Sequence, residues 1–275
     1  MQFVQLTHAQ RRAFAADGFL MVPQAIDAAT VACLTKASDR LMKSFLDDPA
    51  EIQMQLRQGV VQEEAFDQLV SNSATVPLVV QLLSPNIHLH SASVIYKKSQ
   101  DPHTTEPRRG WHRDIGIAED LGQAGLPLLG VKVCYCLTDF AEPNSGMTMM
   151  ARGTHLNETP LAIPTGAVDP PTVVDPLLRA GDAILFENRT FHTAAPNLSQ
   201  RTSKVIIYGY AYRWMKTDQY LDPPDQRVLQ RTTNDIDWQL LGGYYNVDEI
   251  PRALIDWAEQ YGVNPPSVTW TTDAL

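Results

Sequence analysis

Apolar positions near the N-terminus recur with helical spacing between recognisable helix end signals. Thr7 and Gln10 match a capping box, and Gly18 is the expected stop of the helix that they begin. Asp27 is an expected N-cap for a second helix. The apolar face of that helix consists of Val31, Leu34, Leu41 and Phe45. The pattern therefore predicts two amphipathic helices at the start of the chain.

The short apolar run Phe19–Val22 is predicted to be a strand, whereas residues 49–83 are predicted to be mainly helical. From His88 onward, short runs rich in Val, Ile, Tyr and Thr alternate with Gly, Pro and Asn. These predicted strands are Ile87–Lys98, Val131–Thr138, Met147–Ala151, Thr172–Val174, Ala183–Phe186 and Lys204–Arg213. Many short strands separated by turns favour a sandwich or jelly roll over a doubly wound parallel sheet.

Several predicted strands are apolar on both faces, as in Val205–Tyr208. This pattern fits a mainly β fold with flanking helices, in which the N-terminal helices cover the outer face of a sheet. Another helix is predicted over Pro251–Tyr261. Because no internal repeat or low-complexity linker is visible, we expect one domain over residues 1–275. Its expected parts are a helical layer at 1–86, a jelly-roll core at 87–213 and a C-terminal extension at 214–275.

Composition and charge narrow the classes of partner. The chain has 275 residues, of which 44% are hydrophobic and 19% charged, and its net charge is −9. An acidic chain without a basic run is not expected to bind nucleic acid or an anionic membrane surface. No stretch approaches the roughly 20 apolar residues of a membrane span, and the N-terminus lacks the pattern of a signal peptide. We therefore expect a cytoplasmic protein, monomeric or homodimeric, with a small molecule as its partner.

The cysteines are Cys33, Cys134 and Cys136. Their odd number and the lack of a CxxC pair argue against a disulfide framework. Because Cys134 and Cys136 share one face of a predicted strand, we expect buried free thiols.

Candidate chemistry gathers in the segment Gly110–Gly116. Side chains two apart on a strand share a face, so His112 and Asp114 project together while Arg113 points away. An imidazole beside a carboxylate makes two-thirds of a 2-His-1-carboxylate site, which holds ferrous iron and leaves coordination positions open. The triplet alone fits an ion pair at a strand end equally well. His192 supplies the third candidate ligand, far enough downstream for the intervening strands to turn round a jelly roll and return.

Arg201 and Ser203 occupy alternate positions on the strand that follows His192. A guanidinium beside a hydroxyl is suited to bidentate capture of a carboxylate, although an exposed turn arginine is the simpler interpretation of Arg201 alone. The same strand face continues through Val205, Ile207, Gly209 and Ala211. Small residues at these positions would leave room for a ligand.

Further segments follow in a fixed order: Leu6–Leu20, Trp111–Asp114, Leu137–Gly146, Arg152–His155, Gly181–Asp182 and His192–Arg201. As an ordered set they resemble the phytanoyl-CoA dioxygenase family of iron(II)/2-oxoglutarate-dependent oxygenases. The resemblance implies a double-stranded β-helix, iron at His112, Asp114 and His192, and 2-oxoglutarate and O2 as cosubstrates. It also implies that Arg201, helped by Ser203, binds the distal carboxylate of 2-oxoglutarate. Family members often place this arginine further from the distal histidine, where this chain has Ser203.

The reaction that the resemblance implies couples oxidative decarboxylation of 2-oxoglutarate to oxidation of a C–H bond. Related halogenases carry a small residue at the position of Asp114, so the aspartate indicates oxygen chemistry. A CoA thioester would call for clustered cations, and Lys97–Lys98 and Arg108–Arg109 are the only such pairs nearby. We therefore expect a smaller, mostly apolar substrate, as in secondary-metabolite tailoring. The alternatives are a non-catalytic jelly-roll protein that binds a metal or small ligand, and a zinc hydrolase, for which no candidate general base is visible.

Other polar residues are weaker candidates. His155 is expected to be structural, and His88 and His90 share a strand face without a third ligand nearby. Residues on the same strand that could reach the cosubstrate are Ser91, Ser93, Tyr96 and Lys97. Ser99–Gly110 is the predicted closing element of the substrate entrance, and Trp214–Tyr245 is the candidate for a second wall.

Overall fold

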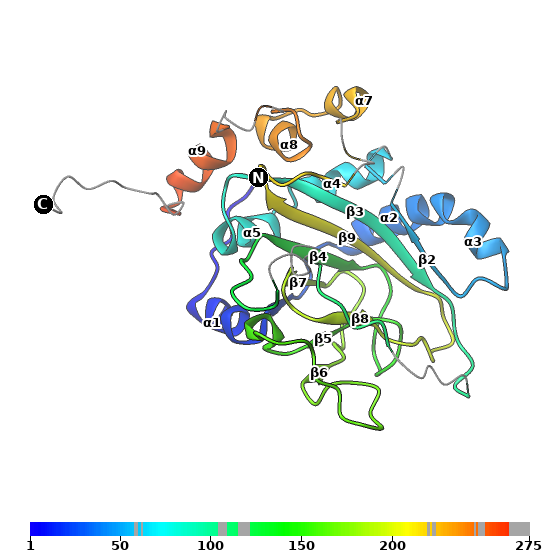
Figure 1. The fold of residues 1–275 in the computed structure, drawn as a ribbon. Helices are drawn as coiled ribbons and strands as arrows, with labels where there is room; N and C mark the ends of the chain where they lie inside the picture. Colours follow the sequence, from blue (N-terminus) through cyan, green and yellow to red (C-terminus); the bar gives the residue numbers. More distant parts are fainter. Residues whose placement is uncertain are drawn as a thin grey trace, which may run out of the picture.

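Strands from distant parts of the chain pair in a six-stranded antiparallel sheet (Figure 1). The computed structural model describes residues 1–57, 60–61, 63–103, 109–114, 122–218, 221, 224–244, 246 and 251–263. In sheet order the strands are β1 (Phe19–Val22), β7 (Ala183–Glu187), β4 (Gly130–Cys136), β9 (Ser203–Tyr212), β3 (Ile87–Lys97) and β2 (Gln53–Leu56). Each neighbouring pair is antiparallel.

A second antiparallel sheet lies across one face of the first (Figure 1). Its strands, in order, are β6 (Val173–Val174), β5 (Thr148–Ala151) and β8 (His192–Ala194). Two facing antiparallel sheets with this many crossovers form a jelly roll. The predicted mainly β class with flanking helices and a double-stranded β-helix core is confirmed.

Helices flank the sheets on the outside. They are α1 (His8–Asp17), α2 (Ala28–Leu41), α3 (Lys43–Asp47), α4 (Asp67–Val70), α5 (Val76–Leu82), α7 (Gln226–Leu229), α8 (Asp235–Leu240) and α9 (Arg252–Gln260), with 3-10 turns η1 (Glu64–Phe66) and η2 (Thr154–Leu156). Helix α2, at 14 residues, is the longest of them. Among the described residues, no helix has both the length and the apolar character needed to cross a membrane.

The predicted helix ends are present. Thr7 accepts a hydrogen bond from the backbone of Gln10 and completes a capping box at the start of α1, and Gly18 ends that helix with a φ of 82°. Asp27 caps α2 through the backbone of Thr30. Local side-chain chemistry therefore sets both helix starts, as the sequence indicates.

The prediction for residues 49–83 is wrong in part, because residues 53–56 form strand β2. Its sequence, Gln-Met-Gln-Leu, alternates polar and apolar positions with the period of a strand. Strands β1 and β2 form the two edges of the larger sheet, although both come from the region expected to be a helical layer. Strand β8 and helices α7 and α8 were also not predicted.

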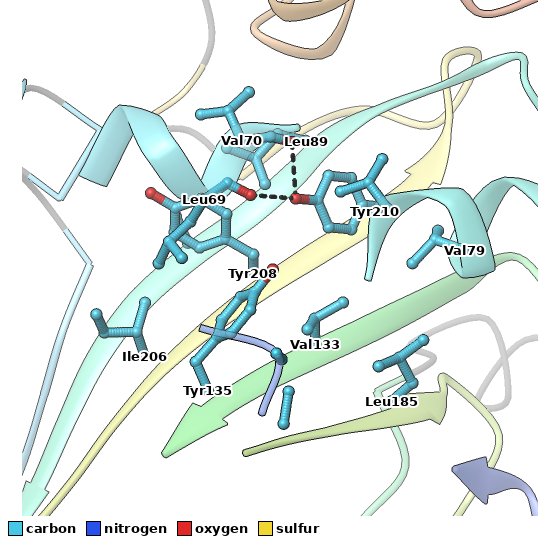
Figure 2. Packing of buried hydrophobic residues seen from close by; sticks show 14 of the residues in the cluster. Leu69, Val70, Val79, Leu89, Val133, Tyr135, Leu185, Ile206, Tyr208 and Tyr210 are labelled. Carbon is cyan, nitrogen blue, oxygen red and sulfur yellow. Dashed lines mark hydrogen bonds between the residues drawn. The ribbon is translucent and has the colours of Figure 1, made fainter. Parts of the chain in front are cut away.

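The outer face of the larger sheet carries a row of tyrosines that packs against the N-terminal helices (Figure 2). Tyr208 donates a hydrogen bond to the carbonyl of Phe66, and the Tyr135 hydroxyl lies 2.7 Å from that of Thr75. Tyr210 donates to the carbonyls of Leu69 (3.2 Å) and Val70 (2.9 Å). These phenols join the helical layer to β4 and β9 by both apolar burial and hydrogen bonds.

The inner face packs a separate apolar cluster between the two sheets. Its buried members are Phe19, Cys134, Cys136, Phe140, Met147, Met150, Leu178, Ile184, Phe186, Val205 and Ile207. Burial raises the pKa of the Cys134 thiol to about 12, so it is an inert, protonated side chain. The expectation of free thiols is confirmed, but Cys33 is exposed rather than buried.

Removing one phenol tests the junction between helices and sheet. Tyr210→Phe is expected to lower the free energy of unfolding by about 1–3 kcal/mol, because both carbonyl bonds are lost in a buried setting. Tyr261→Phe, at a ring that is 45% exposed, is the matched control and should change stability by less than about 0.5 kcal/mol. Urea unfolding measures both, and equal midpoints for Tyr210→Phe and the wild type would contradict this account.

Candidate metal and ligand site

Backbone pairing brings the two candidate histidines side by side. The amide of His112 donates to the carbonyl of His192 (3.1 Å), and the amide of His192 donates to the carbonyl of His112 (3.0 Å). The amide of Asp114 continues the pairing by donating to the carbonyl of Asn188 (3.0 Å). The His-x-Asp segment thus lies along the free edge of β8, the strand that carries His192.

The three side chains converge on one point. Nε2 of His192 lies 3.2 Å from Oδ2 of Asp114, and Nε2 of His112 lies 3.8 Å from Oδ1. One ligand atom from each of the three residues lies within 4.8 Å of the others. His192 is 7% exposed in its side chain and His112 is 55% exposed, so the cluster opens toward solvent on the His112 side. This spacing fits a single small cation.

The tautomer of each imidazole is set by a backbone carbonyl. Nδ1 of His112 lies 2.7 Å from the carbonyl oxygen of Gly110, and Nδ1 of His192 lies 3.0 Å from that of Thr190. Because a carbonyl only accepts, each Nδ1 must carry the proton. Each Nε2 then faces the point at which the three side chains converge, as in metal-binding histidines.

Neighbouring side chains stabilise the ionised form of Asp114. Burial acts to raise the pKa of Asp114, but His192 and Lys132 outweigh this effect and hold the pKa below its usual range. Nζ of Lys132 lies 2.5 Å from Oδ2. Desolvation and the neighbouring His192 lower the pKa of His112, so its imidazole is neutral at pH 7. Two imidazoles and one carboxylate form a donor set for a divalent transition metal.

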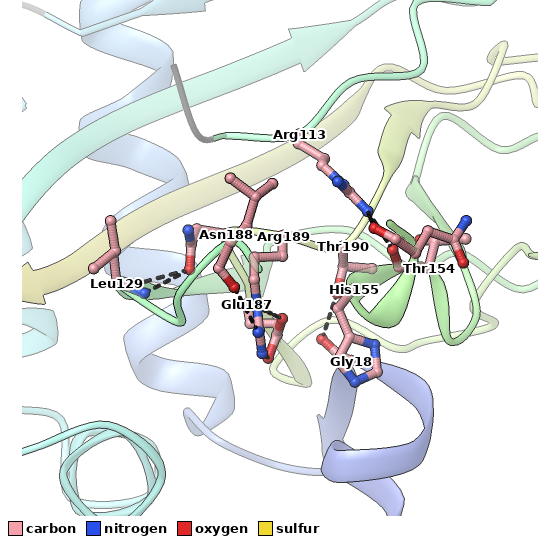
Figure 3. Close-up of polar contacts among 12 residues, drawn as sticks. Gly18, Arg113, Leu129, Thr154, His155, Glu187, Asn188, Arg189 and Thr190 are labelled. Atoms are coloured by element: carbon pink, nitrogen blue, oxygen red, sulfur yellow. Dashed lines mark hydrogen bonds and ion pairs between the residues drawn. The ribbon is translucent and has the colours of Figure 1, made fainter. Parts of the chain in front are cut away.

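Polar contacts of residues next to the triad in sequence fix the backbone that carries it (Figure 3). Arg113 points away from His112 and Asp114, as predicted. It donates to the carbonyls of Thr154 (2.6 Å) and Asn157 (3.0 Å). The side chain of Asn188 accepts from the amide of Leu129 (3.0 Å). Thr190 donates to the carbonyl of Gly18 (2.9 Å), which ties the turn before β8 to the end of α1.

Two adjoining cavities meet at the cluster. The first, of about 330 Å³, is lined by the triad together with residues of β2, β3, β5 and β9. The second, of about 440 Å³, lies toward the other end of β3 and β9. The side chains shared by both are Gln55, Arg57, Asp114, Lys132 and Ile207. The carboxylate of the cluster therefore stands on the boundary between the two spaces.

Of the two residues predicted to bind the cosubstrate, one lines the first cavity and the other does not. Ser203 is 4% exposed and lines the space that contains the triad. Arg201 is not among the lining residues; its side chain is 55% exposed and its NH1 lies 3.6 Å from Oδ2 of Asp139. The structure thus leaves Arg201 in the surface-turn position that its sequence context also allows.

The weaker candidates fall on different sides of the sheet. His155 is structural, because its Nε2 lies 3.0 Å from the carbonyl oxygen of Ala15, away from the triad. Tyr96 faces the helices and donates to Asp39 (2.6 Å). Ser91 and Ser93 line the second cavity, and Lys97 lines the first.

Lys132 and Gln55 are among the lining residues that were missed from the sequence. Lys132 shares the inward face of β4 with Cys134, and Gln55 lies on the unpredicted strand β2. Strand alternation was the available signal for both: period 2 puts Lys132 on the same face as Cys134, and it puts Gln53 with Gln55. The sequence gives no sign that Lys132 and Asp114 meet, because the two residues lie on different segments of the chain.

The predicted entrance segments are seen in part. Within Ser99–Gly110, residues 104–108 lie outside the described residues, and so does Arg108 of the Arg108–Arg109 pair; Gly110 lines the first cavity. Within the second predicted segment, the described residues that line the second cavity are Trp214, Met215 and Asp218. Residues 219–220, 222–223 and 245 of that segment lie outside the described residues.

A jelly roll that carries two imidazoles and one carboxylate on neighbouring strands is the framework of a non-haem iron oxygenase. The family model described as phytanoyl-CoA dioxygenase matches residues 14–205, which is most of the chain. The chain belongs to this family of iron(II)- and 2-oxoglutarate-dependent oxygenases.

Individual relatives agree with this assignment. The dioxygenase cdmA of Talaromyces verruculosus is 32% identical over 96 residues, covering 34% of this chain and only about a third (31%) of that relative. HygX from Streptomyces hygroscopicus, solved with nickel and 2-oxoglutarate bound, superposes with a TM-score of 0.63 at 17% identity, over 78% of this chain and 90% of that one. SnoK, an alpha-ketoglutarate-dependent carbocyclase from nogalamycin biosynthesis, gives 0.58 at 19% identity, over 75% and 84%. At these identities the two structures establish the shared fold.

The histidine pair on β3 has a different role from the triad. His88 is 7% exposed, and its Nε2 has no hydrogen-bond partner among the described residues. Desolvation, followed by the charges of His90 and Arg213, lowers the pKa of His88 to about 4. His88 is therefore a neutral, buried side chain at neutral pH.

This shift makes stability depend on pH in a definite direction. Between its unfolded pKa of 6.5 and its folded value of about 4, His88 binds a proton more readily in the unfolded chain. Its contribution is complete above pH 6.5 and is lost as the pH falls toward 4, by about 3 kcal/mol in total. Denaturant unfolding between pH 7 and 4.5 should show the wild type losing more stability than His88→Gln. Parallel curves for the two proteins would rule out this role.

Proposed function

We propose that His112, Asp114 and His192 hold ferrous iron, and that the enzyme oxidises a C–H bond of a small organic molecule with 2-oxoglutarate and O2. One observation carries the proposal: two Nε2 atoms and a carboxylate face one point, while both Nδ1 atoms are engaged by carbonyls. Among the described residues the cluster offers three protein ligands, which suits a metal that must keep positions open for a chelating cosubstrate and O2.

When bound, iron with 2-oxoglutarate and O2 supplies an oxidative decarboxylation that is coupled to C–H oxidation. The chain's own residues prepare this chemistry. The carbonyls of Gly110 and Thr190 orient the two imidazoles, and the ring of Phe186 lies 4.8 Å from that of His192. Val205 continues the apolar wall of the same cavity. Apolar walls around a charged cluster keep bulk water away from a reactive centre.

We infer that the second cavity receives the substrate, because it opens directly onto Asp114 and Lys132. Much of its wall is apolar, and the side chains that form this part are Leu129, Val131, Ile207, Ala211, Trp214 and Met215. Gly209 adds no side chain, and a Cβ there would lie 2.4 Å from the hydroxyl of Ser91. The space suits a compact molecule with an apolar body and a few hydroxyl or carbonyl groups.

The names of structural relatives support a role in secondary-metabolite tailoring. HygX was solved with hygromycin B bound, and SnoN was solved in complex with nogalamycin RO. A CoA thioester is a poorer match, because Arg57 and Lys132 are the only cationic residues among the described residues that line the second cavity, and both also line the first cavity. Screening compounds for stimulation of succinate release tests the substrate class.

Anaerobic titration tests the proposal as a whole. Adding ferrous iron and then 2-oxoglutarate to the metal-free protein should produce the visible charge-transfer band of a chelated 2-oxo acid. Stoichiometric binding of iron with no band on adding 2-oxoglutarate would favour a non-catalytic metal-binding protein. A strict requirement for zinc would favour the hydrolase alternative.

Loss of one ligand should abolish metal binding without unfolding the protein. Asp114→Ala is expected to weaken ferrous iron binding by more than about 100-fold, because even the partners of metal ligands contribute 10- to 100-fold. His192→Ala should have a similar effect, whereas His8→Ala, at an exposed position of α1, should have none. Equilibrium dialysis with iron analysis measures the affinity. Full iron binding by Asp114→Ala would overturn the assignment of the triad.

The wall of the second cavity provides an independent test. Trp214 is 59% exposed and stacks on Tyr212 with ring centroids 5.6 Å apart, so its outer face is open to a ligand. With a substrate identified by the screen, Trp214→Ala should lower kcat/KM by about 5- to 30-fold through the loss of apolar contact. The binding of 2-oxoglutarate should stay unchanged. Leu177→Ala, at a residue that is 56% exposed and lines neither cavity, is the control.

A further inference from the structure

We propose that Lys97, assisted by Ser203, binds the distal carboxylate of 2-oxoglutarate in this chain, and that Arg201 does not. The inference rests on the proposed function, since it concerns the cosubstrate of the same site. It differs from the arrangement that the family resemblance implies, in which an arginine near the distal histidine has this task.

The sheet register places Lys97 and Ser203 together at the inner end of the first cavity. They are direct partners across β3 and β9, and both line the space that contains the triad. Directly paired residues of an antiparallel pair point to the same face, with Cβ atoms about 5 Å apart. Lys97 is 5% exposed and Ser203 is 4% exposed. The structure thus brings an ammonium group and a hydroxyl into the metal cavity, away from bulk water.

The position of the Lys97 ammonium relative to the triad is set by the strand that follows the distal histidine. Its Nζ donates to the carbonyl of Ala195 at 2.8 Å. Ala195 lies three residues beyond His192, and an extended chain advances about 3.3 Å per residue. Ala195 therefore lies about 10 Å along the chain from His192, and the Lys97 ammonium group sits beside it in the same cavity. A five-carbon dicarboxylate whose 2-oxo acid end faces the triad would extend toward this group.

The chemistry at this end of the cavity favours a carboxylate. An ammonium group in this cavity is a charged donor for a carboxylate, and that of Lys97 also donates to Ala195. Among the described residues, the hydroxyl of Ser203 makes long contacts with the carbonyls of Lys97 (3.3 Å) and Gly146 (3.5 Å), so it can turn toward a stronger acceptor. Charge-assisted hydrogen bonds are about twice as strong as neutral ones.

Gly146 makes room for the Ser203 hydroxyl. Its φ is +86°, and a Cβ at this position would lie 2.4 Å from Oγ of Ser203. Any other residue would push the hydroxyl out of place or strain the turn. Gly146 also lines the first cavity, so the turn that precedes β5 forms part of the same wall.

The loop before β9 explains why the Arg201 side chain lies outside the cavity. Asn197 is fully buried, and its Nδ2 donates to the carbonyls of both Lys97 and Arg201 at 2.8 Å. Ser199 donates to the Arg201 carbonyl as well (3.2 Å). These bonds turn the backbone of Arg201 toward the loop interior. The guanidinium is thereby left outside, beside Asp139.

Matched variants in the iron-loaded protein test the assignment. Under anaerobic conditions, Lys97→Met should weaken 2-oxoglutarate binding by about 30-fold or more, the effect of removing one partner of a desolvated charge pair. Arg201→Met should change the affinity by less than about 3-fold. The charge-transfer band and titration calorimetry both report binding without turnover. Lys97→Arg keeps the positive charge and should retain more of the affinity than Lys97→Met.

A shorter 2-oxo acid separates recognition of the distal carboxylate from damage to the fold. 2-Oxobutyrate keeps the chelating end but lacks the distal carboxylate. The wild type should prefer 2-oxoglutarate over it by about 30-fold or more, and this preference should collapse in Lys97→Met while iron binding stays unchanged. A variant that had merely lost its structure would lose iron as well.

The outcomes separate this inference from the proposed function. If the iron-loaded wild type binds no 2-oxoglutarate, the proposed function itself fails. If the wild type binds it and Arg201→Met loses it, with or without an effect of Lys97→Met, the arginine is the anchor and the inference is overturned. If Lys97→Met keeps the wild-type preference for 2-oxoglutarate over 2-oxobutyrate, the inference is overturned too.

Discussion

The pairing of His112 with His192 at the edge of β8 is the constraint on which the site depends. Two reciprocal backbone hydrogen bonds bring together residues that lie eighty positions apart in the chain, and Asp114 follows because strand alternation places it beside His112. The same backbone supplies the carbonyls that set both imidazole tautomers. The geometry of the cluster therefore comes from sheet pairing, which is rigid, rather than from side-chain contacts alone.

The two faces of the larger sheet have different roles: the outer face stabilises the fold, and the inner face carries the site. Its outer face is joined to helices through buried phenols, so that Tyr208 and Tyr210 hold the layer that covers the sheet. Its inner face carries alternate residues of β3 and β9, among them Lys97 and Ser203, toward the metal cavity. A register slip of one residue would exchange these faces. The tyrosine row thus protects the site by fixing the register.

Features that depend on residues close in the sequence could be predicted, whereas features that depend on contacts between distant segments could not. The helix caps at Thr7 and Asp27, and the shared face of His112 and Asp114, depend on neighbours within a few residues and could be predicted. The side-chain direction of Arg201 could not, because it depends on the buried Asn197, which joins two chain segments. The contact of Lys132 with Asp114 likewise depends on strand order in the folded sheet. Strand β2 was missed although its polar–apolar alternation was visible. It has only four residues, and the sequence on both sides of it favoured helix.

The most direct test of the central claim is anomalous diffraction at the iron edge from crystals grown anaerobically with ferrous iron and 2-oxoglutarate. The account predicts one strong peak bonded to Nε2 of His112, Nε2 of His192 and a carboxylate oxygen of Asp114, with two further positions taken by the 2-oxo acid. A peak that lacks any one of these three ligands, or one ligated through Nδ1 of either histidine, would contradict it.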